Sequence, residues 1–363
     1  MPRRVAIVHD YLNQWGGAER VLEELHTIWP DAPIFVSIYD RERMPAAYRE
    51  WDIRTTFMQR LPGILRNHQP YLPVYPLAFS RLDLRGYDLI VSSSSAFAKN
   101  VYPPAGATHI CYCHSPMRFA WNAADYARRE RLGGLTRRAL DPFLRGLRRW
   151  DARGTRRVDH LIANSAVVAA RIKRFYGREA AIIHPPVRTA IPAATGEAGD
   201  FYLIVTRLVP YKRLDIVVEA FNRLGKPLRI AGVGRDRAAL EALAGPQITF
   251  LGGISDAEKD RLYGECRATI FPAEDDFGIA QVEAQAAGRP VIAYRAGGAI
   301  ETVVDGVTGI FFDAQTPESI IAAVERRESV TFDPATIRAH ARTFDAAVFR
   351  QRLEEFVDVV SRG

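Results

Sequence analysis

The chain has 363 residues, of which 48% are hydrophobic and 25% are charged, with a formal net charge of +7. This mix is typical of a globular protein and excludes a disordered, collagen-like or coiled-coil chain. At about 150 residues per domain, the length favours two domains. The longest uncharged stretch, residues 102–117, contains three prolines and falls short of the ~20 apolar residues of a membrane span. No transmembrane helix is therefore predicted.

The N-terminal half begins with an apolar run at residues 5–8, which stops at His9 and is too short for a signal peptide. We interpret it as the first strand of a cytoplasmic protein, and three cysteines, too few for a disulfide framework, agree with a reducing compartment. A helix is predicted over residues 18–29. Further strands are predicted at residues 34–39, 87–92, 109–113, 161–164 and 181–184. Short apolar runs that alternate with helices indicate a parallel α/β sheet.

The second half repeats this pattern after residues 187–200, which we interpret as an interdomain linker. Strands are predicted at residues 202–205, 228–231, 248–251, 268–271 and 290–293, and helices at 214–224 and 346–361. The expected domains are residues 1–186 and 201–345, with residues 346–363 packing back towards the first domain. This fold class is α/β, with two Rossmann-like parallel-sheet domains that face each other across a cleft. The functional site is expected where loops at the carboxyl ends of both sheets converge.

Positive charge is concentrated in residues 118–178, which carry 16 basic and five acidic side chains, a net +11, so the remainder carries −4. This segment lacks interleaved aromatic residues and any recognised nucleic-acid motif, so no nucleic-acid partner is predicted. Within residues 128–157, apolar side chains recur among arginines. The pattern suits a helix in the interface of an anionic membrane, or an ordinary amphipathic helix packed on the N-terminal sheet. The apolar positions are Leu132, Leu135, Leu140, Phe143, Leu144, Leu147 and Trp150.

An acidic element at residues 271–293 is the sharpest chemical signal. A strand ends in an acidic turn with Asp275, and a glycine then opens a helix. Backbone amides at the start of that helix, near Gly278 and Ile279, lack intrahelical partners and favour a phosphate. Glu283 lies one turn into the helix, where a carboxylate can accept hydrogen bonds from sugar hydroxyls. The structural alternative for Asp275 and its neighbour Asp276 is helix capping.

Two cations follow the strand at 202–205 and are five residues apart across a proline turn. Arg207 and Lys212 can bind a diphosphate from two sides, and the alternative is an ordinary solvated loop. After the next strand comes Gly232-Val233-Gly234, which fails as a dinucleotide fingerprint because position 237 is Arg237. A tight turn with close approach of a ligand remains open.

The sequence Cys111-Tyr112-Cys113-His114 contains residue types that bind metals. Strand alternation, however, places both thiols on one face, as core residues. No second Cys or His pair stands at zinc spacing, so no metal site is predicted. His114, at the end of the strand, is a candidate to face the cleft. Its alternative is a structural histidine.

Four ordered motifs together resemble the retaining glycosyltransferases of family 4, also called glycosyl transferases group 1, with the GT-B fold. They are the glycine loop Gly16-Gly17-Ala18-Glu19-Arg20, His114-Ser115-Pro116, Arg207 with Lys212, and the acidic element ending in Glu283-Ala284-Gln285-Ala286. The resemblance runs from residue 5 to about residue 323. Within the family the sequence is most similar to bacterial enzymes that build O-antigen or exopolysaccharide, several of which are mannosyltransferases.

The resemblance implies a nucleoside-diphosphate sugar as donor, with GDP-mannose favoured over UDP-sugars, and a lipid-linked saccharide as acceptor. It implies that Gly16 and Gly17 approach the donor β-phosphate, that Arg207 and Lys212 neutralise the diphosphate, and that Glu283 binds the ribose. No cofactor and no divalent metal are implied. The expected location is the cytoplasm, and the amphipathic pattern of residues 128–157 predicts peripheral contact at the inner face of the cytoplasmic membrane.

The sugar end of the implied site holds His114, beside the transferred sugar, and Asp275. At the position of Asp275 the family has a glutamate, eight positions before the glutamate that matches Glu283. The shorter side chain of Asp275 is a departure from that pattern. The resemblance implies front-side attack, in which the leaving phosphate takes the acceptor proton, so no protein nucleophile is needed. Alternatives are a sugar-nucleotide epimerase on the same architecture, a non-catalytic sugar-nucleotide binder, and a nucleic-acid binder that uses the basic segment.

Overall fold

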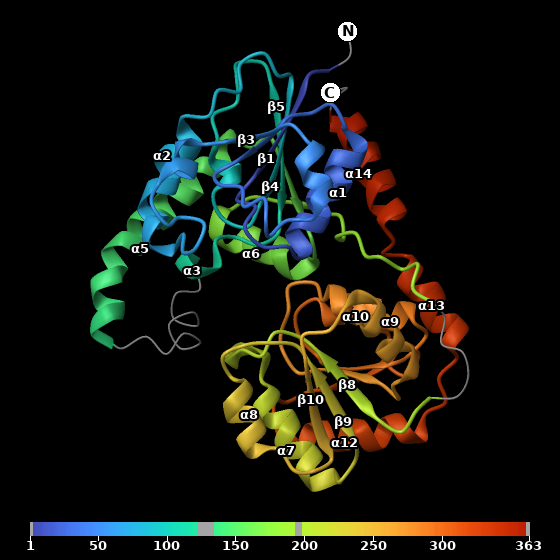
Figure 1. Ribbon diagram of the computed structural model, residues 1–363. Coiled ribbons are helices and arrows are strands. Elements are labelled where there is room, and N and C mark those ends of the chain that lie inside the picture. The colour runs from blue at the N-terminus through green and yellow to red at the C-terminus, as the bar shows by residue number, and fades with distance from the viewer. Residues whose placement is uncertain (1–2, 122–133, 193–197, 361–363) are drawn as a thin grey trace. The chain divides into compact units, whose positions relative to one another are not determined.

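A computed structural model describes residues 3–121, 134–192 and 198–360, with backbone alone for residues 134–140. The chain forms two compact units. The N-terminal unit comprises Met1–Pro186 with Phe349–Gly363, and the C-terminal unit comprises Val187–Val348. Figure 1 shows both units, each with its own sheet.

The described N-terminal unit contains one parallel sheet with the strand order β3-β2-β1-β4-β5-β6-β7. Its central pair aligns Ile7 of β1 with Val91 of β4. Alternation along β1 places Ile7 in one core cluster and Ala6 and Val8 in another, so both faces of the sheet are covered. The strands are β1 Val5–His9, β2 Ile34–Val36, β3 Ile53–Thr55, β4 Leu89–Ser94, β5 Thr108–Cys113, β6 His160–Ala163 and β7 Ala181–Ile182.

The helices of this unit cover the two faces of its sheet (Figure 1). Helices α1 and α14 pack on the face to which Ile7 belongs, whereas α2 and α5 pack on the face of Ala6 and Val8. The α-helices are α1 Gly17–Ile28, α2 Tyr75–Ser80, α3 Arg118–Trp121, α5 Gly134–Gly154, α6 Ala166–Tyr176 and α14 Ala346–Val360. Short 3₁₀ helices are η1 Ala46–Glu50, η2 Phe57–Arg60, η3 Gln69–Val74, η4 Ala98–Asn100 and η5 Thr155–Arg157.

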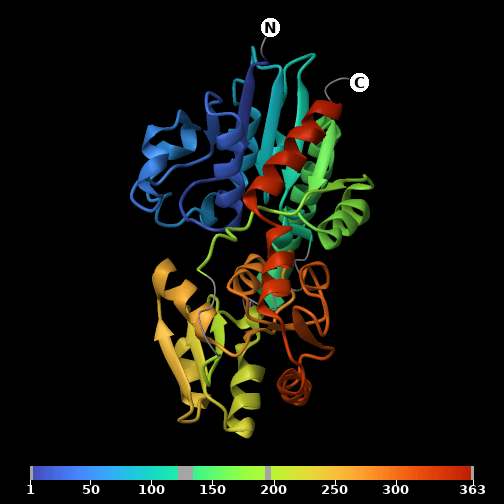
Figure 2. The same cartoon turned by 90° about the vertical axis from the view of Figure 1, so that its right-hand side faces the viewer.

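Helix α14 returns from the far end of the chain to this unit, as Figure 2 shows in red. Its Phe349, Leu353 and Val357 lie in the same core cluster as Val21 and Leu22 of α1. These three residues are spaced four apart and so form one apolar stripe. The C-terminal helix therefore completes the core of a sheet that begins more than 300 residues earlier in the chain.

A buried carboxylate fixes the loop that follows β4. Asp10 is 3% exposed and accepts four backbone N–H bonds, from Ser95 to Ala98, at 2.6–2.9 Å. These amides belong to residues 95–97 and to the first residue of η4, and a buried amide without a partner is costly. The loop at the carboxyl edge of the sheet thereby has a defined position.

Helix α5 is attached to the same loop by a second buried charge. Lys99 lies 2.6 Å from Asp151, and both side chains are fully buried. Burial lowers the pKa of Lys99, but nearby charges and a hydrogen bond, the Asp151 carboxylate first among them, together raise it above its ordinary value. Trp121 and Tyr176 also donate to Asp151, at 2.7 and 2.6 Å. One carboxylate thus joins α3, α5 and α6 to the loop after β4.

The structure describes the side chains of only part of the apolar stripe in the basic segment. Leu147 is buried in the N-terminal core, and Phe143 and Trp150 pack against it. These three side chains therefore pack on their own unit, as the second interpretation expects, and α5 continues through Pro142 and Gly146. Leu144 is half-buried and is not among the residues of this core cluster, and the side chains of Leu132, Leu135 and Leu140 lie outside the described residues.

The C-terminal unit contains a second parallel sheet, with the order β10-β9-β8-β11-β12-β13 over its described residues. Tyr202 and Ile204 face one core cluster and Leu203 faces the other. The strands are β8 Tyr202–Val205, β9 Leu228–Ala231, β10 Ile248–Gly252, β11 Thr269–Phe271, β12 Val291–Tyr294 and β13 Gly309–Phe312. The helices are η6 Pro210–Lys212, α7 Leu214–Leu224, α8 Arg237–Leu243, α9 Asp256–Glu265, α10 Ile279–Ala286, α11 Ala299–Thr302, α12 Pro317–Ser329 and α13 Pro334–Arg342.

The α/β class with two parallel sheets is confirmed, and the differences are local. Strands β3 and β13 were not predicted, because Arg54 and Thr55 are exposed polar residues and Gly309 is typical of turns. The segment interpreted as a linker packs Val187 and Ile191 into the core of the C-terminal unit. In the part of the chain that the structure describes, no helix is long and apolar enough to cross a bilayer.

Each sheet has a point where the chain reverses its direction of winding. In the N-terminal sheet this point lies between β1 and β4, and in the C-terminal sheet between β8 and β11. Loops at the carboxyl ends of such strand pairs diverge and leave room for a ligand. These two edges are therefore where chemistry is expected within each unit.

Candidate functional site

An ion pair lies at the winding reversal of the C-terminal sheet. Nζ of Lys212, in the loop after β8, is 2.7 and 2.8 Å from the two carboxylate oxygens of Asp275, in the loop after β11. The side chains are 16% and 24% exposed, so both are partly accessible to solvent. The structure thus brings together two residues that the sequence predicted from separate motifs.

The backbone around this pair is tightly constrained. Lys212 ends η6, and the next residue, Arg213, has a φ of +52°, the only positive φ among the described residues other than glycines. On the opposite side, Gly298 donates its N–H to the carbonyl of Asp275 at 2.9 Å. A Cβ at Gly297 would lie 2.2 Å from that same carbonyl oxygen. The loop after β12 therefore holds the acidic turn in place, and only glycine permits this approach.

Helix α10 begins directly after the acidic turn. Its N-cap is Gly278, with a φ of +95°, and a glycine has no side chain to cap the helix. The carboxylate of Asp275 is paired with Lys212, and capping by Asp276 stays a prediction. The amide end of α10, with Ile279 as its first residue, carries the partial positive charge of the helix dipole.

Glu283 lies one turn into α10 and is 3% exposed. Its Oε2 is 3.3 Å from Nζ of Lys259, on α9. Lys259 also contacts Asp256 at 3.0 Å, at the start of its own helix. The sequence analysis predicted a role for Glu283 but not for Lys259. The ion pair gives Glu283 a structural role in addition to its predicted contact with ribose.

Arg207 is exposed, and its guanidinium donates to the hydroxyl of Tyr211 at 3.1 Å. It follows the same strand as Lys212, so both cations belong to the edge where the acidic turn lies. Arg207 is not paired with the carboxylate of Asp275 in any described contact. Lys212 is thus paired with a carboxylate, whereas the exposed Arg207 contacts a neutral hydroxyl.

The two glycines after β9 have a packing role. A Cβ at Gly232 would lie 1.8 Å from the carbonyl oxygen of Thr206, and one at Gly234 would lie 2.0 Å from that of Leu208. The loops after β8 and β9 are also joined by a bond from the amide of Leu208 to the carbonyl of Val233, at 2.9 Å. Close approach of a neighbouring backbone accounts for both glycines, while their predicted contact with the donor remains a prediction.

In the N-terminal unit, His114 follows β5 at the edge of the sheet and is partly buried. Its Nε2 is 2.8 Å from Oγ of Ser93. Its backbone is held on both sides, by its amide to the carbonyl of Ser94 at 2.9 Å and by Asn164 Nδ2 to its own carbonyl at 3.0 Å. The ring therefore has a fixed place at the end of the strand.

Gly16 and Gly17 form the start of α1, as the sequence predicted for a glycine loop before a helix. Gly16 is the N-cap, in extended conformation, and Gly17 is the first helical residue. A Cβ at Gly16 would meet no atom closer than 3.5 Å, on Glu19. Packing within the protein does not require a glycine there, in contrast to Gly232 and Gly234.

Cys111 and Cys113 are both buried in one core cluster, on the same face of β5. A hydrogen bond with Cys111, together with burial, raises the pKa of Cys113, so this side chain is a thiol. Among the residues that the structure describes, no three His, Cys, Asp or Glu side chains gather as metal ligands.

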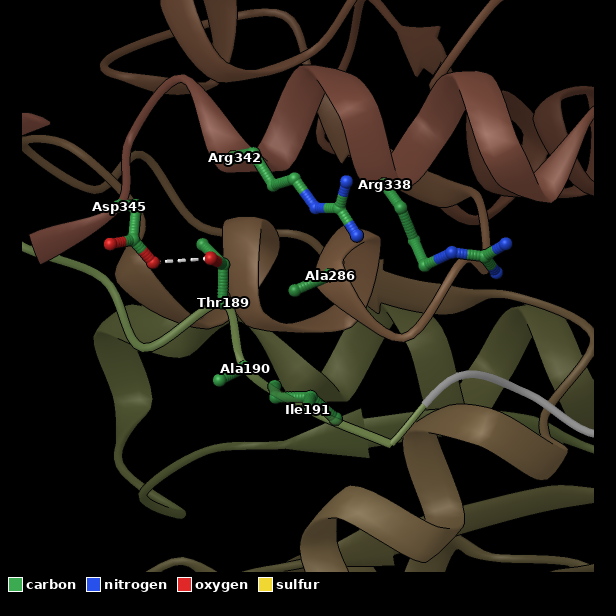
Figure 3. Close-up of a pocket in the computed structure, with 7 residues that line it drawn as sticks. All are labelled: Thr189, Ala190, Ile191, Ala286, Arg338, Arg342 and Asp345. Atoms are coloured by element: carbon green, nitrogen blue, oxygen red, sulfur yellow. Dashed lines mark hydrogen bonds between the residues drawn. The ribbon is translucent and has the colours of Figure 1, made fainter. Parts of the chain in front are cut away.

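A pocket of about 440 Å³ lies elsewhere in the C-terminal unit (Figure 3). It is lined by Ala286, at the end of α10 opposite to Gly278, and by Arg338 and Arg342 of α13. The remaining lining residues are Thr189, Ala190, Ile191 and Asp345. None of the residues that the sequence predicted for donor binding lines this pocket.

Comparison with known proteins adds to this geometry. A profile described as Glycosyltransferase Family 4 matches residues 15–191, and one described as Glycosyl transferases group 1 matches residues 189–341. The two matches together cover both units. The chain belongs to the GT-B glycosyltransferases. The glycosyltransferase resemblance is confirmed at this level, while the retaining mechanism and the mannosyl specificity stay predictions.

The relatives of this glycosyltransferase are distant. A glycogen synthase of Pseudomonas aeruginosa is 32% identical over 150 residues, which cover 39% of this chain and 29% of that protein. The chain thus spans less than a third of this curated relative. Among solved structures, Anabaena Alr3699/HepE in complex with UDP and glucose has a TM-score of 0.71 at 18% identity, covering 98% of this chain and 99% of that one. The lipopolysaccharide outer core galactosyltransferase WaaB has a TM-score of 0.69 at 15% identity and 99% coverage of both chains.

The packing role of Gly234 predicts that Gly234→Ala destabilises the C-terminal unit by about 1–3 kcal/mol, because the new methyl group must displace the Leu208 backbone. The midpoint of urea unfolding measures this effect. Gly253→Ala is the matched control, since a Cβ at Gly253 would meet only Val233, at an ordinary 3.7 Å. Equal midpoints for the two variants would contradict the packing role.

Proposed function

We propose that this glycosyltransferase transfers a hexose with retention, mannose being favoured, from a nucleoside-diphosphate sugar to a lipid-linked saccharide. The observation that carries the proposal is the pairing of Lys212 with Asp275 at the winding reversal of the C-terminal sheet. The cation, the acidic turn and the start of α10 lie at one edge of the sheet. There a sugar diphosphate could place its phosphates near the cation and the helix amides, and its sugar hydroxyls near the carboxylate.

The phosphates of the donor are assigned to the cations and amides of this edge. Lys212 and Arg207 supply fixed positive charge, and the N-terminus of α10 at Gly278 supplies backbone N–H groups. Departure of the nucleoside diphosphate develops negative charge on the β-phosphate. Groups that are already in place stabilise this charge more in the transition state than in the ground state, which accelerates transfer.

The sugar and the ribose are assigned to the carboxylates. Asp275 accepts hydrogen bonds from sugar hydroxyls, and its hold on Lys212 keeps both side chains at the same point. Glu283 accepts from the ribose hydroxyls. No protein nucleophile is needed when the acceptor attacks from the front and the leaving phosphate takes its proton, and the cations make a divalent metal unnecessary.

On the N-terminal unit we assign two contacts. His114 contacts the transferred sugar, and its place at the carboxyl end of β5 supports this role. The Gly16–Gly17 turn approaches the β-phosphate of the donor. The space around Gly16 supports the assignment, since the protein's own packing gives no reason for a glycine there.

The nucleotide is tested by thermal unfolding of the full chain with GDP, UDP, ADP or dTDP. A ligand that binds only the folded state raises the unfolding temperature. At a ligand concentration of 100 times its Kd, the free energy of unfolding rises by about 2.7 kcal/mol. GDP is expected to give the largest shift, with UDP as the alternative that the Anabaena complex supports. If none of the four shifts the transition, the donor assignment is wrong.

Lys212→Ala is expected to lower kcat roughly 30- to 1,000-fold, because one lost charge in a preorganised site costs about 2–4 kcal/mol of barrier. Transfer of labelled sugar from the donor identified above measures this loss. Lys226→Ala is a matched control, since it breaks a 2.9 Å ion pair with Glu328 in the same unit. A Lys212→Ala enzyme with unchanged kcat removes this lysine from the mechanism.

A lipid-linked acceptor is presented at a membrane surface. We therefore propose that the protein makes peripheral contact with an anionic lipid surface through α5. Arg149 and Arg153 are exposed, one turn apart, on the helix whose Leu147 is buried in the core of the N-terminal unit. The contact is then electrostatic, at about 1 kcal/mol for each cation, and it weakens in salt.

The combined variant Arg149→Glu and Arg153→Glu should reduce sedimentation with anionic vesicles at low salt. Arg66→Glu with Arg352→Glu changes the net charge equally at exposed arginines elsewhere and should sediment like wild type. Equal recovery of the wild-type protein with neutral and anionic vesicles would refute the membrane contact.

A further inference from the structure

A chain of polar contacts runs through the edge of the N-terminal sheet to His114. Nδ1 of His9 is 3.1 Å from Oγ of Ser93, and the same Oγ is 2.8 Å from Nε2 of His114. At the other end, Nε2 of His9 lies 3.5 Å from a carboxylate oxygen of Glu19. Glu19, His9 and Ser93 are 4%, 2% and 0% exposed, so this chain is shielded from bulk water.

The members of this chain come from four adjacent elements. His9 ends β1, Ser93 is near the end of β4, and His114 follows β5, and these three strands are neighbours in the sheet. Glu19 belongs to the first turn of α1, directly after the Gly16–Gly17 turn. The chain therefore connects the glycine loop to the histidine across the winding reversal.

The two hydrogen bonds of the chain, His9 to Ser93 and Ser93 to His114, each take one proton, and the nearby carboxylate sets the direction in which these protons point. The carboxylate of Glu19, 3.5 Å from Nε2 of His9, favours the imidazole tautomer with its proton on Nε2. Nδ1 of His9 then accepts from the hydroxyl of Ser93. Because Ser93 has a single proton and has donated it, its oxygen accepts from Nε2–H of His114. The lone pair of the His114 ring then lies on Nδ1.

We propose that Glu19, His9 and Ser93 are positioning residues that hold His114 in its Nε2–H tautomer. The Nδ1 atom of His114 then acts as a hydrogen-bond acceptor for a saccharide hydroxyl. This last step rests on the proposed function, whereas the tautomer itself does not. A histidine held in this way accepts a hydroxyl proton in one fixed direction, which selects a sugar that presents a hydroxyl there.

The same sheet contains a second serine–histidine pair with the opposite arrangement. Oγ of Ser92 is 2.8 Å from Nε2 of His109, but Nδ1 of His109 is 3.1 Å from the carbonyl oxygen of Arg157. A carbonyl only accepts, so the proton of His109 lies on Nδ1 and Ser92 donates to Nε2. Burial lowers the pKa of His109 to about 4, which keeps its ring neutral. His109 therefore serves as an internal reference for His114, because its expected tautomer carries the proton on Nδ1 instead of Nε2.

The test is nitrogen NMR of the full chain labelled with ¹⁵N at its histidine rings, because the ring shifts report which nitrogen holds the proton. The His114→Gln and His109→Gln spectra assign the two sets of signals. We expect Nε2–H for His114 and Nδ1–H for His109. A His114 ring in the Nδ1–H form, or an even mixture of both forms, in the wild-type protein would overturn the proposal.

Ser93→Ala removes the bond that transmits the preference, so His114 should become a mixture of tautomers. Ser92→Ala breaks a bond of equal length, from an equally buried serine at the adjacent position of the strand, and it should leave the His114 signals unchanged. Should Ser93→Ala fail to fold, Glu19→Gln replaces it. This change removes the charge with little change of shape, and it too should mix the His114 tautomers. An unaltered His114 tautomer in the folded variant contradicts the proposal.

Activity provides a separate readout. In a transfer assay, Ser93→Ala should lower kcat about ten-fold, the order of one lost orienting hydrogen bond, while the KM for the donor changes little. Ser93→Thr, which retains the hydroxyl, should recover part of this loss. Absence of any sugar transfer by the wild-type protein counts against the proposed function, whereas the NMR result decides the tautomer independently.

Discussion

The carboxylate of Asp10 organises the edge of the N-terminal sheet on which the rest of that unit's candidate chemistry depends. Four amides of the loop after β4 converge on its two oxygens, within a core that offers them no other partner. The loop continues directly into Lys99, whose buried pair with Asp151 holds three helices. His9 precedes Asp10 in the chain and Ser93 precedes the loop, so the same anchor sets the distance on which the contact with His114 depends.

The C-terminal unit reaches the same end by a different means, close contact between backbones. Gly232 and Gly234 bring the loops of β8 and β9 together, and Gly297 lies against the carbonyl of Asp275. A buried charge is specific but needs every hydrogen bond to be satisfied, whereas a glycine contact needs only the absence of a side chain. The second solution leaves Lys212 and Asp275 at the surface of the edge, where both can exchange partners.

Local signals in the sequence sufficed for the fold class and most strands, and they singled out the individual residues of the candidate site. Alternation within Val5–His9 and the apolar runs of β8 and β9 are properties of neighbouring residues, and they were predicted correctly. The pairing of Lys212 with Asp275 joins positions 63 apart, and the contact of His9 with Ser93 joins positions 84 apart. Both depend on which strands are adjacent, and that order is absent from any local pattern. A polar residue at the end of each central strand is the signal that identifies His9 and Ser93.

The ion pair between Lys212 and Asp275 has a consequence for selectivity among anions. A bare anion that takes Lys212 leaves the carboxylate without its cation, beside a second negative charge, so the exchange is unfavourable. In the proposed function a glycosylated diphosphate differs, because its hydroxyls donate to the carboxylate while its phosphate takes the ammonium. On that proposal, the ion pair favours the glycosylated diphosphate over small inorganic anions such as phosphate.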